Sequence, residues 1–143
     1  MRVDHLGIAV NSIDAARGFY EALGLAVTHE QTVEHEQVRT AMIPIGESRI
    51  ELLEPTSDNS TVGRFLNKRG EGLHHLALHV DDIAATLKAL KSKGVRLISE
   101  QVQVGAGGHL YFFVHPSSAG GVLLEICQEA KPDPEPDQEK DQE

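Results

Sequence analysis

Hydrophobic and polar residues alternate in short segments of this chain, and one such segment occurs twice. Residues 5–10 read HLGIAV and residues 75–80 read HLALHV, so His, Leu and Val recur at matching places. Alternation of this kind is typical of a β-strand, whose successive side chains point to opposite faces. Each segment therefore predicts a strand with a histidine and small residues on one face and bulky aliphatic residues on the other.

Each opening strand is followed by a helix candidate. Apolar residues at helical spacing predict helices over 13–22 and 83–93, and Gly24 and Gly94 stand just beyond, where helices often need a residue with positive φ. The expected apolar faces consist of Ile13, Ala16, Phe19, Tyr20 and Leu23 in the first helix and of Ile83, Leu87 and Leu90 in the second. The bulky face of each opening strand is the natural partner of its helix.

Three more strand candidates complete each half. They cover 26–30, 38–43 and 49–54 in the first half and 96–104, 110–115 and 121–127 in the second, and Pro and Gly residues mark a turn before the last strand of each half. The order βαβββ is thus repeated. We predict an α+β fold in which two tandem βαβββ modules form a cupped mixed sheet.

The repeat also predicts the domain organisation. Residues 1–128 are expected to form one domain, with modules at about 1–62 and 72–128 joined by a linker at 63–71, and a short helix can start at Thr61. Residues 129–143 are acidic, carry three prolines at alternate positions and contain almost no apolar residue. Such a segment has little to bury, so we predict a disordered acidic, Pro-rich tail.

The two halves carry a matching set of residues that bind metals. His5 and His75 open the first strand of each half, and Glu51 and Glu125 lie between aliphatic residues in each closing strand. A single strand histidine is more often structural, and a single glutamate can face solvent. Because all four recur at matching places, we predict that the cupped sheet surrounds one divalent ion held by His5, Glu51, His75 and Glu125. Nitrogen and oxygen ligands of this kind suit Co²⁺, Mn²⁺, Ni²⁺ or Zn²⁺.

The remaining histidines and the single cysteine give weaker signals. Strand alternation predicts that His74 points away from His75 and that His79 can line the cavity. Cys127 shares a face with Glu125 and is interpreted as core packing. No site is predicted from His29, His35, His109 or His115.

Composition narrows the possible partners. A formal net charge of −9 argues against nonspecific binding to nucleic acid, which depends on basic surfaces. No apolar segment approaches the roughly 20 residues that a membrane-spanning helix needs. One cysteine excludes an internal disulfide framework, and no signal peptide is recognisable at the N-terminus. We therefore expect a cytoplasmic protein that binds neither membranes nor nucleic acid.

Four segments carry a resemblance to a known family. They are DHLGIAV (4–10), IPIGESRIELLEPTSDNSTVGRFL (43–66), GLHHLALHVDDI (72–83) and HPSSAGGVLLEI (115–126). With these, residues 3–128 resemble the vicinal-oxygen-chelate superfamily and, within it, the methylmalonyl-CoA epimerases. The resemblance implies a metal-dependent epimerase, active as a homodimer on a small acyl-CoA substrate, that interconverts (R)- and (S)-methylmalonyl-CoA. The α-proton would be abstracted through a metal-stabilised enolate, with Co²⁺ as the expected ion.

The resemblance also assigns roles to residues. The family's metal ligands fall on His5, Glu51, His75 and Glu125, where some members have glutamine at the second position, and Glu125 is the expected catalytic base. A second carboxylate that some members carry has no counterpart in 38–42, where Arg39 cannot act as a base. Glu47, Glu54 and a metal-bound water are the alternatives. The cations available for CoA phosphates are Arg39, Arg49, Arg64, Lys68 and Arg69, and none of them is assigned to the site.

Three other functions share this type of fold. A glyoxalase I-type lyase also uses a metal and two carboxylates, and only the motifs favour the epimerase over it. A non-catalytic drug-binding protein would not need the full set of His and Glu ligands. A dioxygenase typically uses two histidines and one carboxylate, so the extra carboxylate argues against it.

Overall fold

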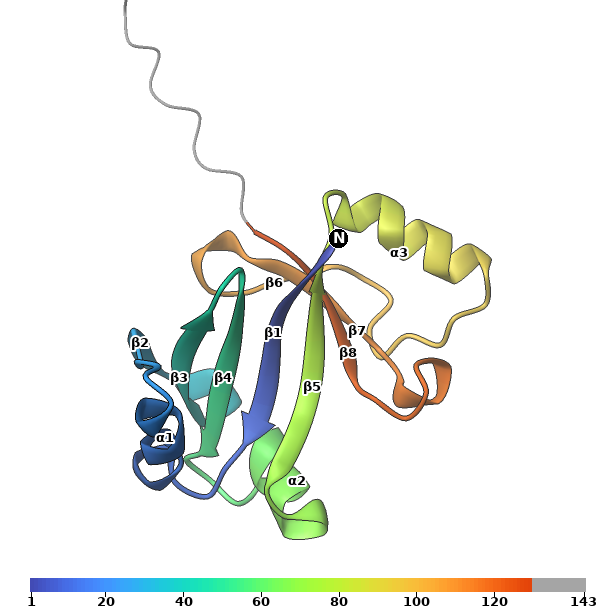
Figure 1. The fold of residues 1–143 in the computed structure, drawn as a ribbon. Coiled ribbons are helices and arrows are strands. Elements are labelled where there is room, and N and C mark those ends of the chain that lie inside the picture. Colours follow the sequence, from blue (N-terminus) through green and yellow to red (C-terminus); the bar gives the residue numbers. More distant parts are fainter. Residues whose placement is uncertain (130–143) are drawn as a thin grey trace, which may run out of the picture.

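The structure, a computed structural model, describes residues 1–129 of the 143-residue chain, and the predicted tail beyond Glu129 lies outside the described residues. The first module contains β1 (Arg2–Ala9), α1 (Ile13–Ala22), β2 (His29–Val33), β3 (Val38–Ile45) and β4 (Ser48–Pro55). Helix α2 (Thr61–Arg69) follows. The second module contains β5 (Gly72–His79), α3 (Ile83–Ser92), β6 (Gln103–Val104), β7 (Leu110–Val114) and β8 (Leu124–Gln128). The predicted βαβββ order is therefore present twice (Figure 1).

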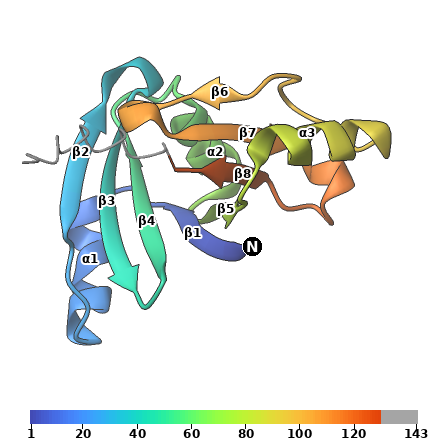
Figure 2. The same cartoon turned by 90° about the horizontal axis from the view of Figure 1, so that it is seen from above.

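All eight strands form one mixed sheet with the order β2-β3-β4-β1-β5-β8-β7-β6. Strands β1 and β5 pair antiparallel at its centre, and each pairs in parallel with the closing strand of its own module, β4 or β8. The order on one side of the β1–β5 pair thus mirrors the order on the other. Figure 2 shows that the sheet curls, so that its two halves face each other across a cupped face. The predicted α+β fold with a cupped mixed sheet is confirmed.

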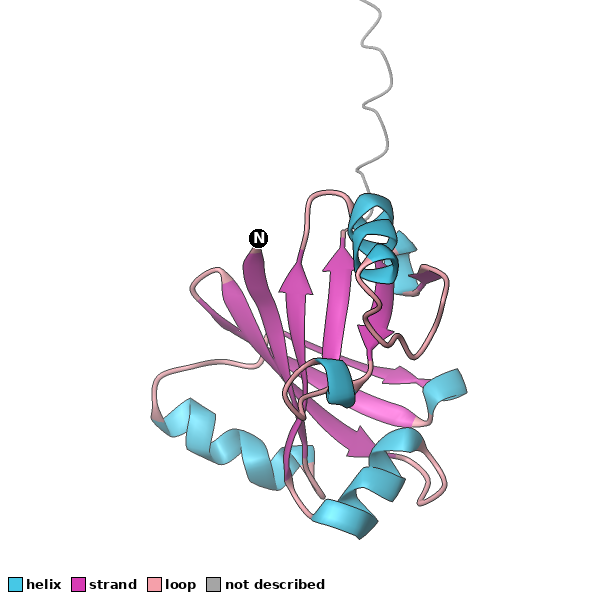
Figure 3. Cartoon of the chain, turned by 90° about the vertical axis from the view of Figure 1, so that its right-hand side faces the viewer, coloured by secondary structure: helices cyan, strands magenta, loops and turns pink. Residues whose placement is uncertain are grey.

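Helices α1 and α3 pack on the outer face of the sheet, each over its own module (Figure 3). Each helix covers its own hydrophobic cluster of buried residues. The cluster under α1 contains Val10, Ile13, Ala41, Ile43 and Leu52, and the cluster under α3 contains Val80, Ile83, Leu87, Phe112, Val114 and Ile126. The bulky faces of the opening strands therefore support the helices, as predicted. Gly24 and Gly94 follow the helices with φ of 91° and 75°, which also agrees with the prediction.

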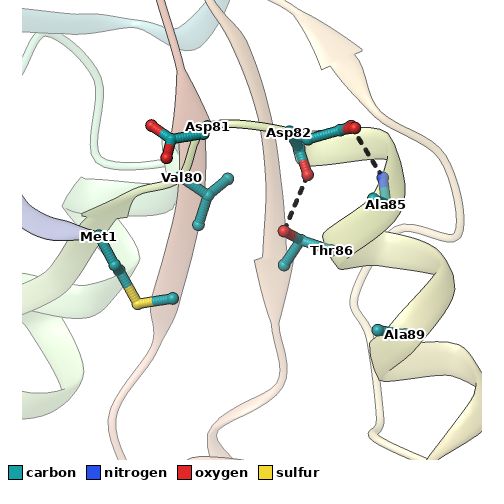
Figure 4. Close-up of a pocket in the computed structure, with 7 residues that line it drawn as sticks. All are labelled: Met1, Val80, Asp81, Asp82, Ala85, Thr86 and Ala89. Atoms are coloured by element: carbon teal, nitrogen blue, oxygen red, sulfur yellow. Dashed lines mark hydrogen bonds between the residues drawn. The ribbon is translucent and has the colours of Figure 1, made fainter.

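The two modules hold their helices in the same way. The Ile13 amide at the start of α1 donates to Glu54 of β4, and the Ile83 amide at the start of α3 donates to Gln128 of β8. These bonds satisfy amides that a helix N-terminus leaves free. Figure 4 shows the cap of α3, where the Asp82 side chain accepts from the Ala85 amide, within a shallow depression on this outer face.

Helix α2 occupies most of the predicted linker and covers one end of the cupped face. Its residues Val62, Phe65 and Leu66 pack against Ala9 of β1 and Leu53 of β4. Ser60 caps the helix by accepting from the Gly63 amide, 3.0 Å away. Among residues 1–129 no helix is long and apolar enough to cross a membrane.

Some predicted elements were wrong in extent. The strand expected at 96–104 is reduced to Gln103–Val104 and one bridge between Leu97 and Val114, because Leu97 and Val102 pack on the core from an irregular segment. The strand expected at 26–30 lies at 29–33, since Leu25 and Val27 pack against the α1 cluster before the strand begins.

The predicted apolar face of α1 is also only partly buried. Phe19 and Leu23 are 66% and 63% exposed, while Ala16 and Tyr20 pack against the core. Only the side of α1 that carries Ile13, Ala16 and Tyr20 faces the sheet, and Phe19 and Leu23 lie outside this contact.

Candidate metal centre and active site

The register of the central strands brings the candidate residues to the cupped face. Gly7 of β1 pairs with Glu51 of β4 on one side and with His75 of β5 on the other. In the same way Ala77 of β5 pairs with Glu125 of β8 and with His5. Since paired residues point to the same face, all four candidate side chains lie opposite the outer-face core.

Three of the four candidate ligands converge. The Nε2 atoms of His5 and His75 are 3.0 Å apart, and each lies 3.8 Å from an oxygen of Glu125. All three residues are buried. One donor atom from each lies within 4.8 Å of the others, so this cluster could hold a metal ion.

Gly7 makes room for this cluster. A Cβ atom built on Gly7 would lie 2.5 Å from Nδ1 of His75, well inside van der Waals contact. The His75 ring therefore lies directly over the glycine backbone of the neighbouring strand. Only glycine at position 7 leaves the space that brings His75 beside His5.

Glu51 lies on the same face but outside the close cluster. No oxygen of Glu51 belongs to the group of donor atoms within 4.8 Å, although Gly7 alone separates it from His75 across the sheet. Burial raises the pKa of its carboxyl group, the charge of His5 lowers it, and the charge of Glu125 raises it further. Glu51 is thus close enough to interact with the cluster without joining it.

The ionisable groups of the cluster differ in their preferred charge. Burial lowers the pKa of His75 to about 4, so its ring is neutral near pH 7. Burial also opposes charge on His5, but its bond to Asp4 and the nearby carboxylates raise the pKa above the usual value. For Glu125, burial is outweighed by His109, His5 and His75, which together lower the pKa.

Strand alternation gave a wrong prediction for His74. Its Nδ1 lies 2.9 Å from Nδ1 of His75, and its ring packs against Phe65 of α2. The pairing of β1 with β5 slips by one residue at His74, because Gly7 pairs with His75 while Ile8 pairs with Leu73. Such a bulge interrupts the alternation of faces.

Two contacts of the cluster were not predicted from the sequence. The buried carboxylate of Asp4 accepts from Nδ1 of His5 at 2.7 Å. His109, which precedes β7, lies 3.6 Å from Glu125 and stacks on Tyr111. Asp4 precedes His5 directly in the sequence, so their pairing could have been suspected. Nothing in the sequence near His109 indicates its contact with Glu125 of β8.

Other residues considered from the sequence lie away from the cluster. Glu54 accepts from the α1 N-terminus on the outer face, which rules it out as a base on the cupped face. Arg39 forms ion pairs with Glu30 and Glu54. Glu47 is exposed in the turn between β3 and β4. Cys127 is the exception, because its Sγ lies within 4.8 Å of donor atoms of Glu125 and His109. It is buried, and burial raises the pKa of its thiol to about 12.

On β3, the residues that share the face of Glu51 are its direct partner Met42 together with Val38, Thr40 and Pro44. Arg39 does not share that face. None of the four residues on the face of Glu51 is a carboxylate. The described part of β3 therefore offers no acid or base to the cupped face.

Comparisons with known proteins extend these observations. A model of the Glyoxalase/Bleomycin resistance protein/Dioxygenase superfamily matches residues 4–113. The uncharacterized protein YqjC of Bacillus subtilis is 44% identical over 128 residues, which covers 89% of this chain and 91% of that protein. The mitochondrial methylmalonyl-CoA epimerase of Homo sapiens is 36% identical over 129 residues, covering 89% and 73%.

A solved structure agrees with these relatives. Methylmalonyl-CoA epimerase of Streptomyces coelicolor, in a variant bound to 2-nitronate-propionyl-CoA, is 39% identical and superposes with a TM-score of 0.84, covering 92% of this chain and 99% of that one. The resemblance seen in the motifs is therefore confirmed. The chain belongs to the glyoxalase/bleomycin resistance protein/dioxygenase superfamily and, within it, to the family of the methylmalonyl-CoA epimerases.

Proposed function

We propose that this protein is a metal-dependent epimerase that interconverts (R)- and (S)-methylmalonyl-CoA by abstraction of the α-proton. The observation that carries the proposal is the buried cluster of His5, His75 and Glu125 on the cupped face of a chain from this family. An epimerase needs a group that removes a proton and a means to stabilise the carbanion. The cluster offers a carboxylate for the first task and a cation site for the second.

The donor set fits a divalent cation. If Asp4 accepts from Nδ1–H of His5, and His74 accepts from Nδ1–H of His75, both Nε2 atoms present lone pairs to each other across 3.0 Å. Two lone pairs at this distance repel unless a cation or a proton lies between them. We propose His5, His75 and Glu125 as ligands, Glu51 as the fourth, and Co²⁺ as the preferred ion, with Mn²⁺, Ni²⁺ and Zn²⁺ as alternatives.

The chemistry then follows from the positions of the carboxylates. When bound, the divalent ion supplies Lewis-acid stabilisation of the negative charge that develops on the substrate oxygens. Glu125 is kept ionised by the surrounding histidines and takes the α-proton of the thioester from one face of the substrate. The electrons of the broken C–H bond pass into the neighbouring carbonyl group. Burial of the site excludes water that would compete for the carbanion.

A second group must deliver a proton to the opposite face, and we propose Glu51 for this role. Asp4 is bound to His5 and Arg49, whereas Glu51 lies on the cupped face beside the cluster. Glu51 and Glu125 lie on equivalent strands on opposite sides of the β1–β5 pair. Burial raises the pKa of the Glu51 carboxyl group, and as the fourth ligand it would bind the ion through one oxygen and leave the other to take and return the proton.

The acyl-CoA chain would leave the cup past α2. This helix covers one end of the cupped face through Phe65. Its cations Arg64, Lys68 and Arg69 are exposed, and the guanidinium of Arg69 lies 5.7 Å from the centre of the Phe65 ring. We propose that these cations contact the CoA phosphates. If the double variant Lys68→Ala/Arg69→Ala has an unchanged KM, this contact is excluded.

We also propose that the chain works as a homodimer in the cytoplasm. The single cysteine, Cys127, is a free and buried thiol, which suits a reducing compartment. Sedimentation of the purified protein tests the assembly.

Proton exchange in D₂O tests the function directly. Each epimer of methylmalonyl-CoA is incubated with protein that has been treated with EDTA and with protein reloaded with Co²⁺, and NMR follows the α-proton. We expect exchange with inversion in the reloaded protein and little in the stripped protein. The hemithioacetal of methylglyoxal and glutathione serves as a control for glyoxalase I-type activity.

Each outcome assigns the protein differently. Metal-dependent exchange with inversion supports the epimerase. Exchange that survives complete metal removal would refute the metal requirement. No exchange by the metal-loaded protein would refute the epimerase, and turnover of the hemithioacetal would then favour a lyase.

A further inference from the structure

The pairing of the two central strands contains two irregularities related by the repeat. On β1, Val3 pairs with Leu78 and His5 with Ala77, so Asp4 is an extra residue. On β5, Gly7 pairs with His75 and Ile8 with Leu73, so His74 is an extra residue. Each extra residue immediately precedes one histidine of the cluster. Bulges re-aim side chains near active sites, and here the same device occurs once in each module.

Both extra residues contact Nδ1 of the histidine that follows them. The Asp4 carboxylate accepts from Nδ1 of His5 at 2.7 Å, and Nδ1 of His74 lies 2.9 Å from Nδ1 of His75. In both cases the partner leaves Nε2 directed into the cluster, where the two Nε2 atoms meet at 3.0 Å. The opposite tautomers would place a hydrogen on each Nε2 and disrupt the site for a cation.

We infer that Asp4 and His74 are positioning residues, placed by paired β-bulges, which fix the tautomer and orientation of His5 and His75 so that both present Nε2 to the ion. The inference rests on the proposed metal centre. Hydrogen bonding at the second ring nitrogen orients a histidine ligand and increases its basicity. The geometry assigns this role to residues that do not themselves touch the ion.

Asp4 is held more firmly than His74. It is 2% exposed, and the oxygen that accepts from His5 also accepts from Arg49 at 2.7 Å. A buried carboxylate without such partners would be costly, so the ion pair explains why it is tolerated. His74 is only half-buried and is supported by the edge of the Phe65 ring at a centroid distance of 5.0 Å. We therefore expect His5 to be the more rigid ligand.

Four variants test the inference. Asp4→Asn replaces a charged group that can only accept by an amide that can also donate to Nδ1 and favour the other tautomer. His74→Leu removes the acceptor, and His74→Asn keeps one near the position of Nδ1. Glu54→Gln is the matched control, because its carboxylate is also hydrogen-bonded to the chain but lies on the outer face. The affinity for Co²⁺ is measured by competition with a chelator, and the visible spectrum of bound Co²⁺ reports the arrangement of ligands.

Loss of an outer partner of a histidine ligand typically costs about 10–100-fold in metal affinity, and we expect this loss for Asp4→Asn and His74→Leu. Glu54→Gln should bind as the wild type does, and His74→Asn should recover most of the affinity that His74→Leu loses. The Co²⁺ spectrum should change in the two impaired variants.

Two negative results have different meanings. If the wild type binds Co²⁺ but both impaired variants bind it equally well with an unchanged spectrum, Asp4 and His74 have no positioning role, while the metal centre stands. If the wild type binds no Co²⁺, the metal centre fails and the inference fails with it. Circular dichroism verifies that each variant is folded, and the two His74 variants decide the question if Asp4→Asn is not.

Discussion

The two modules share one scaffold but present different residues to the cupped face. Both have a helix held through Glu54 or Gln128, a bulge before a histidine, and a carboxylate on the closing strand. At the centre, however, Gly7 of the first module corresponds to Ala77 of the second. The close cluster of donors uses Glu125 and does not include Glu51. The scaffold is therefore nearly symmetric, whereas the chemistry is not.

The environments of the two carboxylates show what this difference achieves. Glu125 is surrounded by His5, His75 and His109, which lower its pKa, whereas burial raises the pKa of Glu51. Pairs of carboxyl groups whose pKa values are separated by their surroundings are typical of acid and base roles in one site. In each direction of the interconversion one carboxylate removes a proton and the other returns one, so the two groups must differ in protonation when a turnover begins.

The largest expected effect comes from replacing one carboxylate at a time. Glu125→Gln and Glu51→Gln should each lower the rate of epimerisation by about 10²–10⁴-fold, the usual contribution of a positioned acid or base. Each variant should still exchange the α-proton of one epimer with D₂O, because the remaining carboxylate can remove and return a proton on its own face. NMR with each pure epimer measures this, and metal content is determined in parallel.

The alternatives give different patterns. If Glu51→Gln epimerises normally at full metal content, Glu51 is a ligand or a bystander and the second proton comes from elsewhere. If Glu125→Gln turns over normally at full metal content, the proposed base is wrong. Loss of exchange in both epimers for either variant would indicate a single base.

The second prediction exchanges the central small residues of the two modules. Gly7→Ala places a Cβ where the His75 ring lies, so the ring must move and the cluster must open. Overpacking of this kind typically costs about 1–3 kcal/mol of folding stability, and we expect Co²⁺ to bind more weakly than in the wild type because the His75 ring is displaced. Ala77→Gly is the matched control and should affect metal binding less. Equal Co²⁺ affinity of Gly7→Ala and wild type would show that His75 does not need its present position.

The fold could be predicted from the sequence to a large extent because the repeat indicated the order of helices and strands in each module. Apolar spacing located α1 and α3 closely, and the alternating strands located β1 and β5. The expected strand at 96–104 failed, since Leu97 and Val102 reach the core without a neighbouring strand to pair with along their length. A few apolar residues that reach the core from an irregular segment produce the same hydrophobic pattern in the sequence as a strand does.

The candidate site was predictable only as far as strand alternation holds. His5, His75 and Glu125 were placed on one face by alternation, and the structure brings them together. Asp4 and His74 were missed because a bulge changes the direction of a side chain without leaving a mark in the hydrophobic pattern. His109 was missed because its contact with Glu125 depends on the path of the loop before β7.

The third prediction compares the two histidines in metal-free protein. Burial lowers the pKa of His75 to about 4, below its ordinary value of 6.5, so the unfolded chain binds the proton first as the pH falls. Stability should therefore decrease between about pH 6.5 and 4, by at most about 1.4 kcal/mol per pH unit. The pKa of His5 is raised in the folded protein despite its burial. Protonation of His5 therefore contributes fully to folding stability below pH 6.5, and this contribution is lost as the pH rises through the raised pKa of the folded state.

NMR titration of the imidazole protons checks these signs in EDTA-treated protein, and urea unfolding at several pH values checks the slope. His75→Leu should remove the decrease in stability below pH 6.5. If His75 titrates above His5, the assignment of the two environments is incorrect.

The smallest expected effect concerns the outer faces of the helices. Phe19 of α1 is 66% exposed, and its counterpart in α3 is Ala89, so only the first module presents an aromatic side chain there. Phe19→Ser should change the free energy of unfolding by no more than about 0.5 kcal/mol, whereas Ile13→Ala on the buried side of the same helix should cost about 2–5 kcal/mol. Urea unfolding measures both. A loss for Phe19→Ser close to that of Ile13→Ala would mean that Phe19 is covered in the native protein. Sedimentation of the variant would then show whether the proposed homodimer provides that cover, because the variant would sediment as a monomer where the wild type does not.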